Sequence, residues 1–454
     1  MRTQEELSFE AAVALAQDVD AMQTWFESYW EMVDPNTRIR RCRVDRIRLR
    51  SGARMVVQYA VDVSDASQLV ERTLTVTGCI HATKSAEQIV AKMIKDDSWS
   101  DLLSACGPGL PRVFAIPFMN MLVQIFPIDR RLPGLARIYP QLPEYAQQQL
   151  AEKQHDSRWR EQPVTSECVR YRSGLNAVLR YSLEQTASGG DHAVYAKVYS
   201  SAEESEAAFA FLHQLDRQTK DLGLRCSRPI CGWPEFAAMV LASATGNTLE
   251  TELQRSHGLD ALERTTDTLA NLATSSVRID PVHASPDQAA CLQRSLKQLK
   301  RIGSDRLPEI HQLEAWIRYP ASALAATHRD LKLEHIYLDE SQITFIDCDS
   351  FSMADPVIDV AMLAARVLAF GQRQRVETTL TNHRINTLVA RYFAQVPTAW
   401  QSRWAVHFAG ALLEIAVGYY GRQETDWHST VNFLIDQAVA AQQADGQATG
   451  IYLS

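Results

Sequence analysis

Hydrophobic positions change their spacing along the first third of the chain. Residues 4–34 carry apolar side chains three or four positions apart, which predicts a helical segment. Residues 38–63 instead alternate polar and apolar side chains, which predicts two strands joined by a turn at Ser51-Gly52. A further strand, a helix and another strand follow before residue 128. This part of the chain is therefore expected to form a small antiparallel sheet with one helix.

The same order of elements begins again after an offset of about 120 residues. Three segments align, and two arginines, a Ser-Gly pair, a valine and a tyrosine match in the first of them. The aligned pairs are 48–61 with 170–183, 75–82 with 193–200, and 116–132 with 233–249. Any two β-meanders share some pattern, but the constant offset and order favour an internal duplication of the sheet.

Beyond residue 255 the apolar spacing becomes helical, apart from a β-rich interval at 335–347. This succession predicts an α+β chain with two sheet domains and a helical domain. The expected parts are a helical segment (1–37), a first sheet domain (38–155), a second sheet domain (156–255), a helical domain (256–443) and a tail (444–454).

Candidate chemistry lies around the β-rich interval, in the segment THRDLKLEHIYLDESQITFIDCDSF at 327–351. Two apolar runs separated by a polar turn predict a hairpin there, in which His335 lies opposite Asp347 to within about a residue. Asp330 lies on the loop before the first of these strands. Phosphoryl transfer needs one carboxylate to orient and deprotonate the attacking hydroxyl and another to hold magnesium. The two carboxylates of this segment suit that reaction.

The run HRDLK, followed by the hairpin and Asp347, resembles the catalytic loop and the metal-binding aspartate of protein kinases. Asp359 follows only twelve positions after Asp347, which leaves no room for the long activation segment of protein kinases. This compact form, DPVID, resembles the aminoglycoside phosphotransferase family. The resemblance implies a protein-kinase-like two-lobed fold, with an antiparallel β-rich N-lobe and a helical C-lobe, here preceded by a degenerate duplicate of the N-lobe.

The resemblance also implies roles for individual residues. Asp330 is expected to be the catalytic base, with His328 as its structural support, and Lys332 is expected to reach the transferring phosphoryl group. Asp347 is expected to bind magnesium, and Asp359 to anchor the catalytic loop. These roles require ATP and Mg²⁺ as cofactors and a hydroxyl group on the acceptor.

One position departs from the pattern, because His335 replaces the asparagine that usually makes the second metal contact. Magnesium prefers oxygen ligands, so His335 either binds the metal weakly or hydrogen-bonds Asp330 instead. Two interpretations of Asp349 stay open: it supports a second metal ion, or it is a solvated turn residue.

A lysine that clamps the nucleotide phosphates is expected on the third strand of the second sheet domain, where Lys197 lies between apolar neighbours. Glu204 is its expected partner and is expected to point toward the sheet from the following helix. If Glu204 instead caps that helix with Ser201, Glu206 takes the role. The first sheet domain carries Cys79 at the corresponding position, so it is expected not to clamp phosphates in the same way.

Other nucleotide contacts follow from the resemblance alone. The turn at Arg172, Ser173 and Gly174 is expected to cover the phosphates, although no GxGxxG motif is present. The adenine edge is expected to meet the backbone at the end of a later strand, at Leu241 and Ala242.

Composition narrows the choice of partners. The 454 residues include 46 lysines and arginines against 54 acidic residues, a net charge of −8 that argues against general binding to nucleic acids or acidic membranes. The arginine-rich stretch at 38–50 is therefore interpreted as a solvated strand face. Eight cysteines occur without a CxxC pair, no apolar run is long enough to span a bilayer, and the acidic N-terminus is unlike a signal peptide. A soluble, cytoplasmic protein is expected.

The sequence thus predicts an ATP-dependent phosphotransferase whose acceptor is a small molecule with a hydroxyl group, and the resemblance suggests a sugar or aminosugar. His407 and Glu414, on a later apolar helix, either line an acceptor pocket or are satisfied core groups. A pseudokinase or regulatory nucleotide-binding module is the main alternative, and the missing activation segment disfavours a protein kinase. The acceptor, the choice between ATP and GTP and the oligomeric state stay open.

Overall fold

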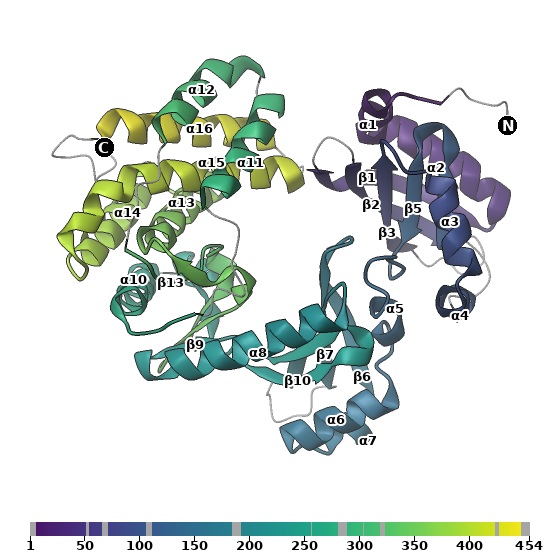
Figure 1. Ribbon diagram of the computed structural model, residues 1–454, viewed down its shortest axis with the longest axis horizontal. Coiled ribbons are helices and arrows are strands. Elements are labelled where there is room, and N and C mark those ends of the chain that lie inside the picture. The colour runs from purple at the N-terminus through teal and green to yellow at the C-terminus, as the bar shows by residue number, and fades with distance from the viewer. Residues whose placement is uncertain are drawn as a thin grey trace. The chain divides into compact units, whose positions relative to one another are not determined.

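The computed structural model describes ten stretches of the chain. They are 6–50, 54–65, 71–105, 111–183, 192–255, 257–279, 288–302, 304–317, 323–422 and 426–445. The chain divides into two compact units (Figure 1). The first consists of Met1–Phe209, Ile230–Ala242 and Gly421–Gln423, and the second of Ala210–Pro229, Ser243–Tyr420 and Glu424–Ser454. The predicted turn at Ser51-Gly52 and most of the predicted tail lie outside the described residues.

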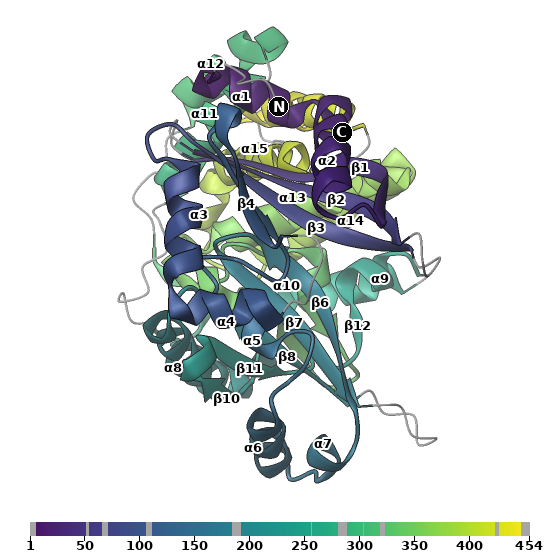
Figure 2. The same ribbon diagram turned by 90° about the vertical axis from the view of Figure 1, so that its right-hand side faces the viewer.

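An antiparallel sheet with helices on both faces forms the N-terminal part of the first unit (Figures 1 and 2). Its strands are β1 (Thr37–Arg50), β2 (Arg54–Asp65), β3 (Glu71–His81), β4 (Val113–Ile116) and β5 (Met121–Ile125), in the order β1-β2-β3-β5-β4. Its helices are α1 (Phe9–Gln17), α2 (Val19–Val33), α3 (Ala86–Lys95) and α4 (Asp97–Ala105). Successive residues of a strand face opposite sides, so Val57 packs with α1 and α2 while Val56 packs with α3 and α4.

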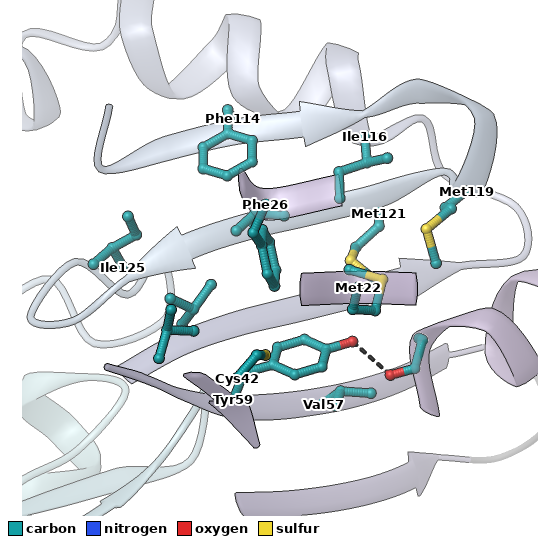
Figure 3. Close-up of a cluster of buried hydrophobic side chains, with 14 of the residues drawn as sticks. Met22, Phe26, Cys42, Val57, Tyr59, Phe114, Ile116, Met119, Met121 and Ile125 are labelled. Carbon is teal, nitrogen blue, oxygen red and sulfur yellow. Dashed lines mark hydrogen bonds between the residues drawn. The ribbon is translucent and has the colours of Figure 1, made fainter. Parts of the chain in front are cut away.

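The predicted N-terminal helical segment forms two helices, because Asp18 ends α1 and caps α2. Its carboxylate accepts a hydrogen bond from the N–H of Ala21 at 3.0 Å. Figure 3 shows the core that these helices bury against the sheet, in which Tyr59 is fully buried. The Tyr59 hydroxyl donates to the carbonyl oxygen of Ala16 at 2.6 Å, so its polar atom is satisfied inside the core.

A second antiparallel sheet in the same unit repeats this topology. Its strands are β6 (Val164–Arg172), β7 (Asn176–Leu183), β8 (Ala193–Val198), β10 (Pro229–Trp233) and β11 (Ala238–Ala242), in the order β6-β7-β8-β11-β10. Cys79 of β3 lies between β2 and β5, and Lys197 of β8 lies between β7 and β11, so the two residues occupy corresponding places. The shared strand order agrees with an internal duplication, which itself stays a prediction.

The core of the second sheet contains a segment that the sequence analysis assigned to the first domain. Its helices are α5 (Leu135–Ile138) and α6 (Glu144–Gln154), and α7 (Arg158–Glu161) follows at the start of the predicted second domain. Buried apolar side chains from Leu132 to Leu150 pack together with Trp159 and the inner side chains of the sheet. The long helix after β8 is α8 (Ala202–Thr219), which follows its strand as α3 follows β3. The second sheet is thus built on residues that precede its first strand by about thirty positions.

The second unit is largely helical, with short strands that carry the candidate catalytic segment. Its helices are α9 (Leu249–Leu253), α10 (Gly258–Thr274), α11 (Gln288–Ile302), α12 (Leu307–Trp316), α13 (Val357–Gln374), α14 (Thr378–Phe393), α15 (Trp404–Arg422) and α16 (Trp427–Ala444). Its strands are β9 (Leu224–Cys226), β12 (Asn247–Thr248), β13 (Ala325–Thr327), β14 (Ile336–Leu338), β15 (Ile343–Phe345) and β16 (Ser352–Ala354). The predicted α+β class is confirmed. Within the described stretches, no helix has the length and apolar character needed to cross a membrane.

Candidate active site

The loop that carries Asp330 runs from β13 to β14 and is held by Asp359 in the first turn of α13. The backbone N–H groups of His328 and Arg329 donate to the two carboxylate oxygens of Asp359, at 2.7 and 2.8 Å. Arg329 adopts a φ of 67°, a conformation that is unfavourable for a residue with a side chain and that these bonds help to hold. Asp359 therefore anchors the loop, as the resemblance implies.

His328 supports this loop from the interior of the second unit. Its ring is fully buried, and its centroid lies 5.8 Å from the ring centroids of both Phe345 and Phe351. Nε2 lies 3.1 Å from the carbonyl oxygen of Ile346, so we assign a proton to this nitrogen, which donates. These contacts fit a supporting role for His328 and leave the reacting role to another group.

The predicted hairpin forms from β14 and β15, in which Ile336 pairs with Phe345. The N–H of Ile346 donates to the carbonyl oxygen of His335 at 3.0 Å, which extends the ladder by one step. His335 Nε2 lies 3.9 Å from a carboxylate oxygen of Asp347. The structure therefore brings these two side chains together at one end of the hairpin, as the sequence predicts.

Two cations flank the Asp330 carboxylate. Lys332 Nζ donates to one oxygen at 2.8 Å, and an Arg366 nitrogen lies 3.9 Å from the other. Burial alone would raise the pKa of Asp330, but Lys332 and Arg366 outweigh it and lower the pKa below its ordinary value. The side chain is 39% exposed, so it offers an ionised and accessible carboxylate that can accept a proton from a hydroxyl.

Asp347 offers the oxygen ligand that magnesium prefers. Mg²⁺ beside nucleotide phosphates is usually held by one or two carboxylates, and phosphates and water complete its shell. The Asp347 side chain is 20% exposed, and Asp349 is exposed in the turn that follows. Over the described parts of the chain, no group of three or more His, Cys, Asp and Glu side chains is arranged to hold a metal ion. The donor set thus fits magnesium only together with bound phosphates.

His335 fits magnesium less well than an asparagine does. Burial, and then the nearby Lys332, lower the pKa of His335 to about 3, so its imidazole is neutral at physiological pH. Its Nδ1 is buried and has no hydrogen-bond partner among the residues that the structure describes. Imidazole nitrogen suits softer ions than Mg²⁺, so Asp347 is the stronger candidate ligand.

A chain of polar side chains links the catalytic loop to Glu414 of α15. The Arg329 guanidinium donates to Gln288 at 3.2 Å, and Gln288 donates to Glu414 at 3.0 Å. Burial, and then the charge of Asp330, raise the pKa of Glu414 to about 7, although Arg329 and two other arginines oppose them. The sequence left the role of Glu414 open, and the structure places it beside the catalytic loop.

His407, the other candidate on α15, is a core group. Its Nε2 lies 3.0 Å from an oxygen of Asp355, which also accepts two hydrogen bonds from the Arg403 guanidinium. All three side chains are buried. Of the two interpretations that the sequence left open for His407, the structure favours the satisfied core group.

Lys197 is buried on β8 in the first unit, whereas Asp330 and Asp347 belong to the second. The meeting of these three side chains around one triphosphate therefore stays a prediction. Leu241 and Ala242, at the end of β11, are partly exposed. Their contact with the adenine edge stays a prediction as well.

Glu204 does not point toward the sheet, so that part of the prediction is wrong. It is exposed in the first turn of α8, where its carboxylate accepts hydrogen bonds from the backbone N–H and the hydroxyl of Ser200. The Ser201 hydroxyl accepts from the N–H of Glu204 at 3.2 Å, which completes a helix cap. Glu204 is thus used in capping, and Glu206, which is also exposed, becomes the predicted partner of Lys197.

Ser173 and Gly174 already have a carboxylate as their partner. Asp129 accepts a hydrogen bond from the Ser173 hydroxyl at 3.1 Å and from the N–H of Gly174 at 2.6 Å. The same oxygen accepts from the Tyr171 hydroxyl at 2.8 Å. Asp129 is 1% exposed and lies in the segment between the two sheets. A phosphate contact at Ser173 and Gly174 therefore stays a prediction, and it would require these two donors to exchange Asp129 for the phosphate.

Residues 167–401, more than half of the chain, match the phosphotransferase enzyme family. No curated protein matches the chain. Among solved structures, the choline/ethanolamine kinase family protein from Mesorhizobium loti is 14% identical with a TM-score of 0.44, and the match covers 68% of this chain and 97% of that one. Choline kinase LicA from Streptococcus pneumoniae is 14% identical with a TM-score of 0.42, covering 65% and 97%. An aminoglycoside phosphotransferase from Streptomyces rimosus is 17% identical with a TM-score of 0.35, covering 54% and 92%.

The family match begins within β6 and includes the catalytic loop, the hairpin and α13. It therefore contains Asp330, Asp347 and Asp359, together with the strand that carries Lys197. The first sheet lies outside the match. The α+β class is confirmed by the sheets and helices of the two units, and its protein-kinase-like arrangement stays a prediction. This chain belongs to the phosphotransferase enzyme family.

Proposed function

We propose that this protein transfers the γ-phosphoryl group of ATP to a hydroxyl group of a small molecule, with Mg²⁺ as its metal ion. The observation that carries the proposal is the anchored loop, on which an ionised Asp330 lies within reach of Lys332 and of the charge of Asp347. Membership in the phosphotransferase enzyme family supports phosphoryl transfer, and the loop residues support the assignment of the groups that perform it.

In this mechanism Asp330 accepts a hydrogen bond from the acceptor hydroxyl and takes its proton as the new O–P bond forms. The bond from the γ-phosphorus to the bridging oxygen breaks, and ADP leaves. Lys332, 2.8 Å from Asp330, positions the carboxylate and offers positive charge to the transferring group. Asp347 would hold Mg²⁺, which neutralises phosphate charge when it is bound. Lys197 is proposed to bind the phosphates that stay on the nucleotide.

The charges near Asp330 narrow the class of acceptor. Lys332 and Arg366 flank this carboxylate. Arg366 also acts on the neighbouring Glu414, together with Arg329 and Arg294. A polycationic aminoglycoside would be repelled by such groups, because like charges oppose association. Of the acceptors that the resemblance suggests, we therefore favour a neutral sugar or an acidic sugar over an aminosugar with several amines.

Coupled measurement of ADP release tests this proposal with neutral sugars, sugar acids, amino alcohols and aminoglycosides as acceptors. We expect release with a neutral or acidic hydroxyl compound and loss of that release in Asp347→Asn. Thermal shift with Mg-ATP, compared with ATP plus a chelator, reports nucleotide binding separately. Metal-dependent binding without turnover for every acceptor class would favour the regulatory-module alternative, and the absence of any such binding would contradict both.

The change His335→Asn is expected to strengthen magnesium binding, because an amide oxygen replaces a neutral imidazole next to Asp347. The Mg²⁺ concentration for half-maximal nucleotide binding should fall on the order of tenfold, as for other neighbours of metal ligands. Metal titrations of the thermal shift, with Mg²⁺ and with Mn²⁺, measure this change. His311→Asn, at an exposed position of α12, is the control. An unchanged preference between the two metals would show that His335 does not face the ion.

A further inference from the structure

Arginines from the first sheet converge on the turn between β6 and β7. Arg54 of β2 donates through Nε to the Cys79 thiol at 3.0 Å. A Cβ placed on Gly174 of the turn would lie 3.5 Å from another nitrogen of Arg54. Arg48 of β1 donates to the carbonyl oxygen of Ser173 in the same turn. The two guanidinium groups therefore lie between the first sheet and this turn, and all of these residues belong to the first unit.

Two further arginines come from the segment between the sheets. The Arg131 side chain lies 3.1 Å from the position of a Cβ on Gly174, and the charge of Arg130 acts on both Cys79 and His81. We refer to Arg48, Arg54, Arg130 and Arg131 as the arginine cluster. The arginine-rich stretch at 38–50 was interpreted from the sequence as a solvated strand face, but Arg48 is only partly exposed, and so is Arg54 of β2.

Cys79 and His81, which lie among these arginines, do not neutralise them. Burial raises the pKa of Cys79, so the thiol stays uncharged at neutral pH. Burial, assisted by Arg54 and Arg130, lowers the pKa of His81 to about 4, so the imidazole is uncharged as well. The Asp129 carboxylate accepts hydrogen bonds from the β6–β7 turn, and its single charge can offset no more than one of the four arginines. Because like charges gathered in one place repel one another, an anion that binds among them is favoured.

The cluster lies at the place in the first sheet that Lys197 occupies in the second. Cys79 corresponds to Lys197 in strand and register, and the Arg54 guanidinium lies against the Cys79 sulfur. The first sheet thus lacks the lysine but receives a cation from the neighbouring strand. A guanidinium group presents a planar pair of donors that matches the oxygens of a phosphate.

We propose that the arginine cluster is a second anion site, which binds a phosphate group of a compound distinct from the nucleotide held at Lys197. Four cations in one place match a multiply charged phosphate better than a single carboxylate. The site is built from the first sheet and the β6–β7 turn, so it does not depend on the phosphotransfer proposed above. A ligand bound there contacts the same turn that Asp129 anchors from within.

Pyrophosphate is the probe for this site. Isothermal titration calorimetry at fixed ionic strength is expected to show binding to the full chain, weakened roughly tenfold or more by Arg54→Gln and by Arg130→Gln. Arg38→Gln is the matched control, because Arg38 is another β1 arginine but is exposed and pairs with Glu31 at 3.1 Å. The affinity of the Arg38→Gln variant for pyrophosphate is expected to equal that of the wild type.

Lys197→Met separates the two anion sites. Pyrophosphate binding that is lost in Lys197→Met but kept in Arg54→Gln would assign the anion to the nucleotide site and overturn the proposal. Equal weakening by Arg38→Gln, or tighter binding of citrate at the same ionic strength, would also overturn it, since neither depends on phosphate recognition by the cluster. If Arg54→Gln does not fold, the exposed Arg130 decides the outcome through Arg130→Gln.

Discussion

Replacement of Asp330 by asparagine is expected to lower kcat roughly 10²–10⁴-fold, because the amide cannot take the proton of the acceptor hydroxyl. The nucleotide KM should change little, since Asp330 is not assigned to the phosphates that stay on ADP. The side chain is 39% exposed, so the loss should not come from unfolding. Steady-state rates of ADP release, measured with the acceptor identified by the screen, check this prediction.

Asp260→Asn is a suitable control for the Asp330 change. Asp260 is an aspartate of the second unit on α10, and its side chain is 79% exposed. We expect wild-type rates from this variant. A kcat of Asp330→Asn within about threefold of wild type would contradict the assignment of the base, because removal of a general base costs far more.

The pH dependence of the rate gives a second test of the same residue. Lys332 and Arg366 lower the pKa of Asp330, so its ionised form persists throughout the range above pH 5. An inflection near pH 7 would instead belong to Glu414, whose pKa burial raises to about 7. Glu414→Gln should then remove that inflection and leave the acid limb of Asp330 unchanged.

Asp355→Asn is expected to lower the free energy of unfolding of the second unit by about 3–5 kcal/mol, because it leaves a buried guanidinium without its carboxylate. Arg403 donates two hydrogen bonds to Asp355, at 2.7 and 3.0 Å, and both side chains are buried. His407 loses a partner 3.0 Å away in the same change. Urea unfolding followed by circular dichroism measures the effect.

Surface pairs supply the control for Asp355. Asp62 pairs with Arg43 on the first sheet, where water and salt screen the interaction, so Asp62→Asn should change stability far less.

The pKa of Asp355 is lowered in the folded protein, mainly by His407 and Arg403 acting against burial. Its contribution is therefore complete above its unfolded pKa near 3.8 and is lost as the pH falls below that value. A difference between variant and wild type that stayed constant down to pH 2 would contradict this account.

Much of the candidate site could be predicted, because most of its residues lie close together in the sequence. The hairpin and the positions of Asp330, Asp347 and Asp359 all follow from one short segment, in which strand alternation and residue spacing suffice. The charges around Asp330 could not be predicted fully from the sequence. Arg366 lies on α13, distant from Asp330 along the chain, and only the fold brings it to 3.9 Å from that carboxylate. Family membership followed from the same segment, whereas the α+β class followed from the succession of strand and helix patterns along the chain.

The errors and omissions lie where two uses of a residue compete or where partners are distant in sequence. The spacing of Glu204 predicts an inward-facing residue, but acidic side chains in the first turn of a helix favour capping. The Glu204 carboxylate instead accepts hydrogen bonds from the N–H and hydroxyl of Ser200. The hydrogen bond from the Gly174 N–H to Asp129 joins residues 45 positions apart, and no sequence motif indicates it. Net charge over the whole chain also concealed the local gathering of Arg48 and Arg54.

The packing of the second sheet on residues that precede it limits how this protein can be shortened. A fragment that began at residue 167, where the family similarity starts, would lack Asp129 and the apolar floor between Leu132 and Leu150. The turn after β6 would then lose its internal acceptor, and the exposed underside of the sheet would invite aggregation. Any truncated version intended for crystallography or engineering must therefore begin upstream of Asp129. The residues that support the second sheet lie before residue 167, outside the part of the chain that matches the family.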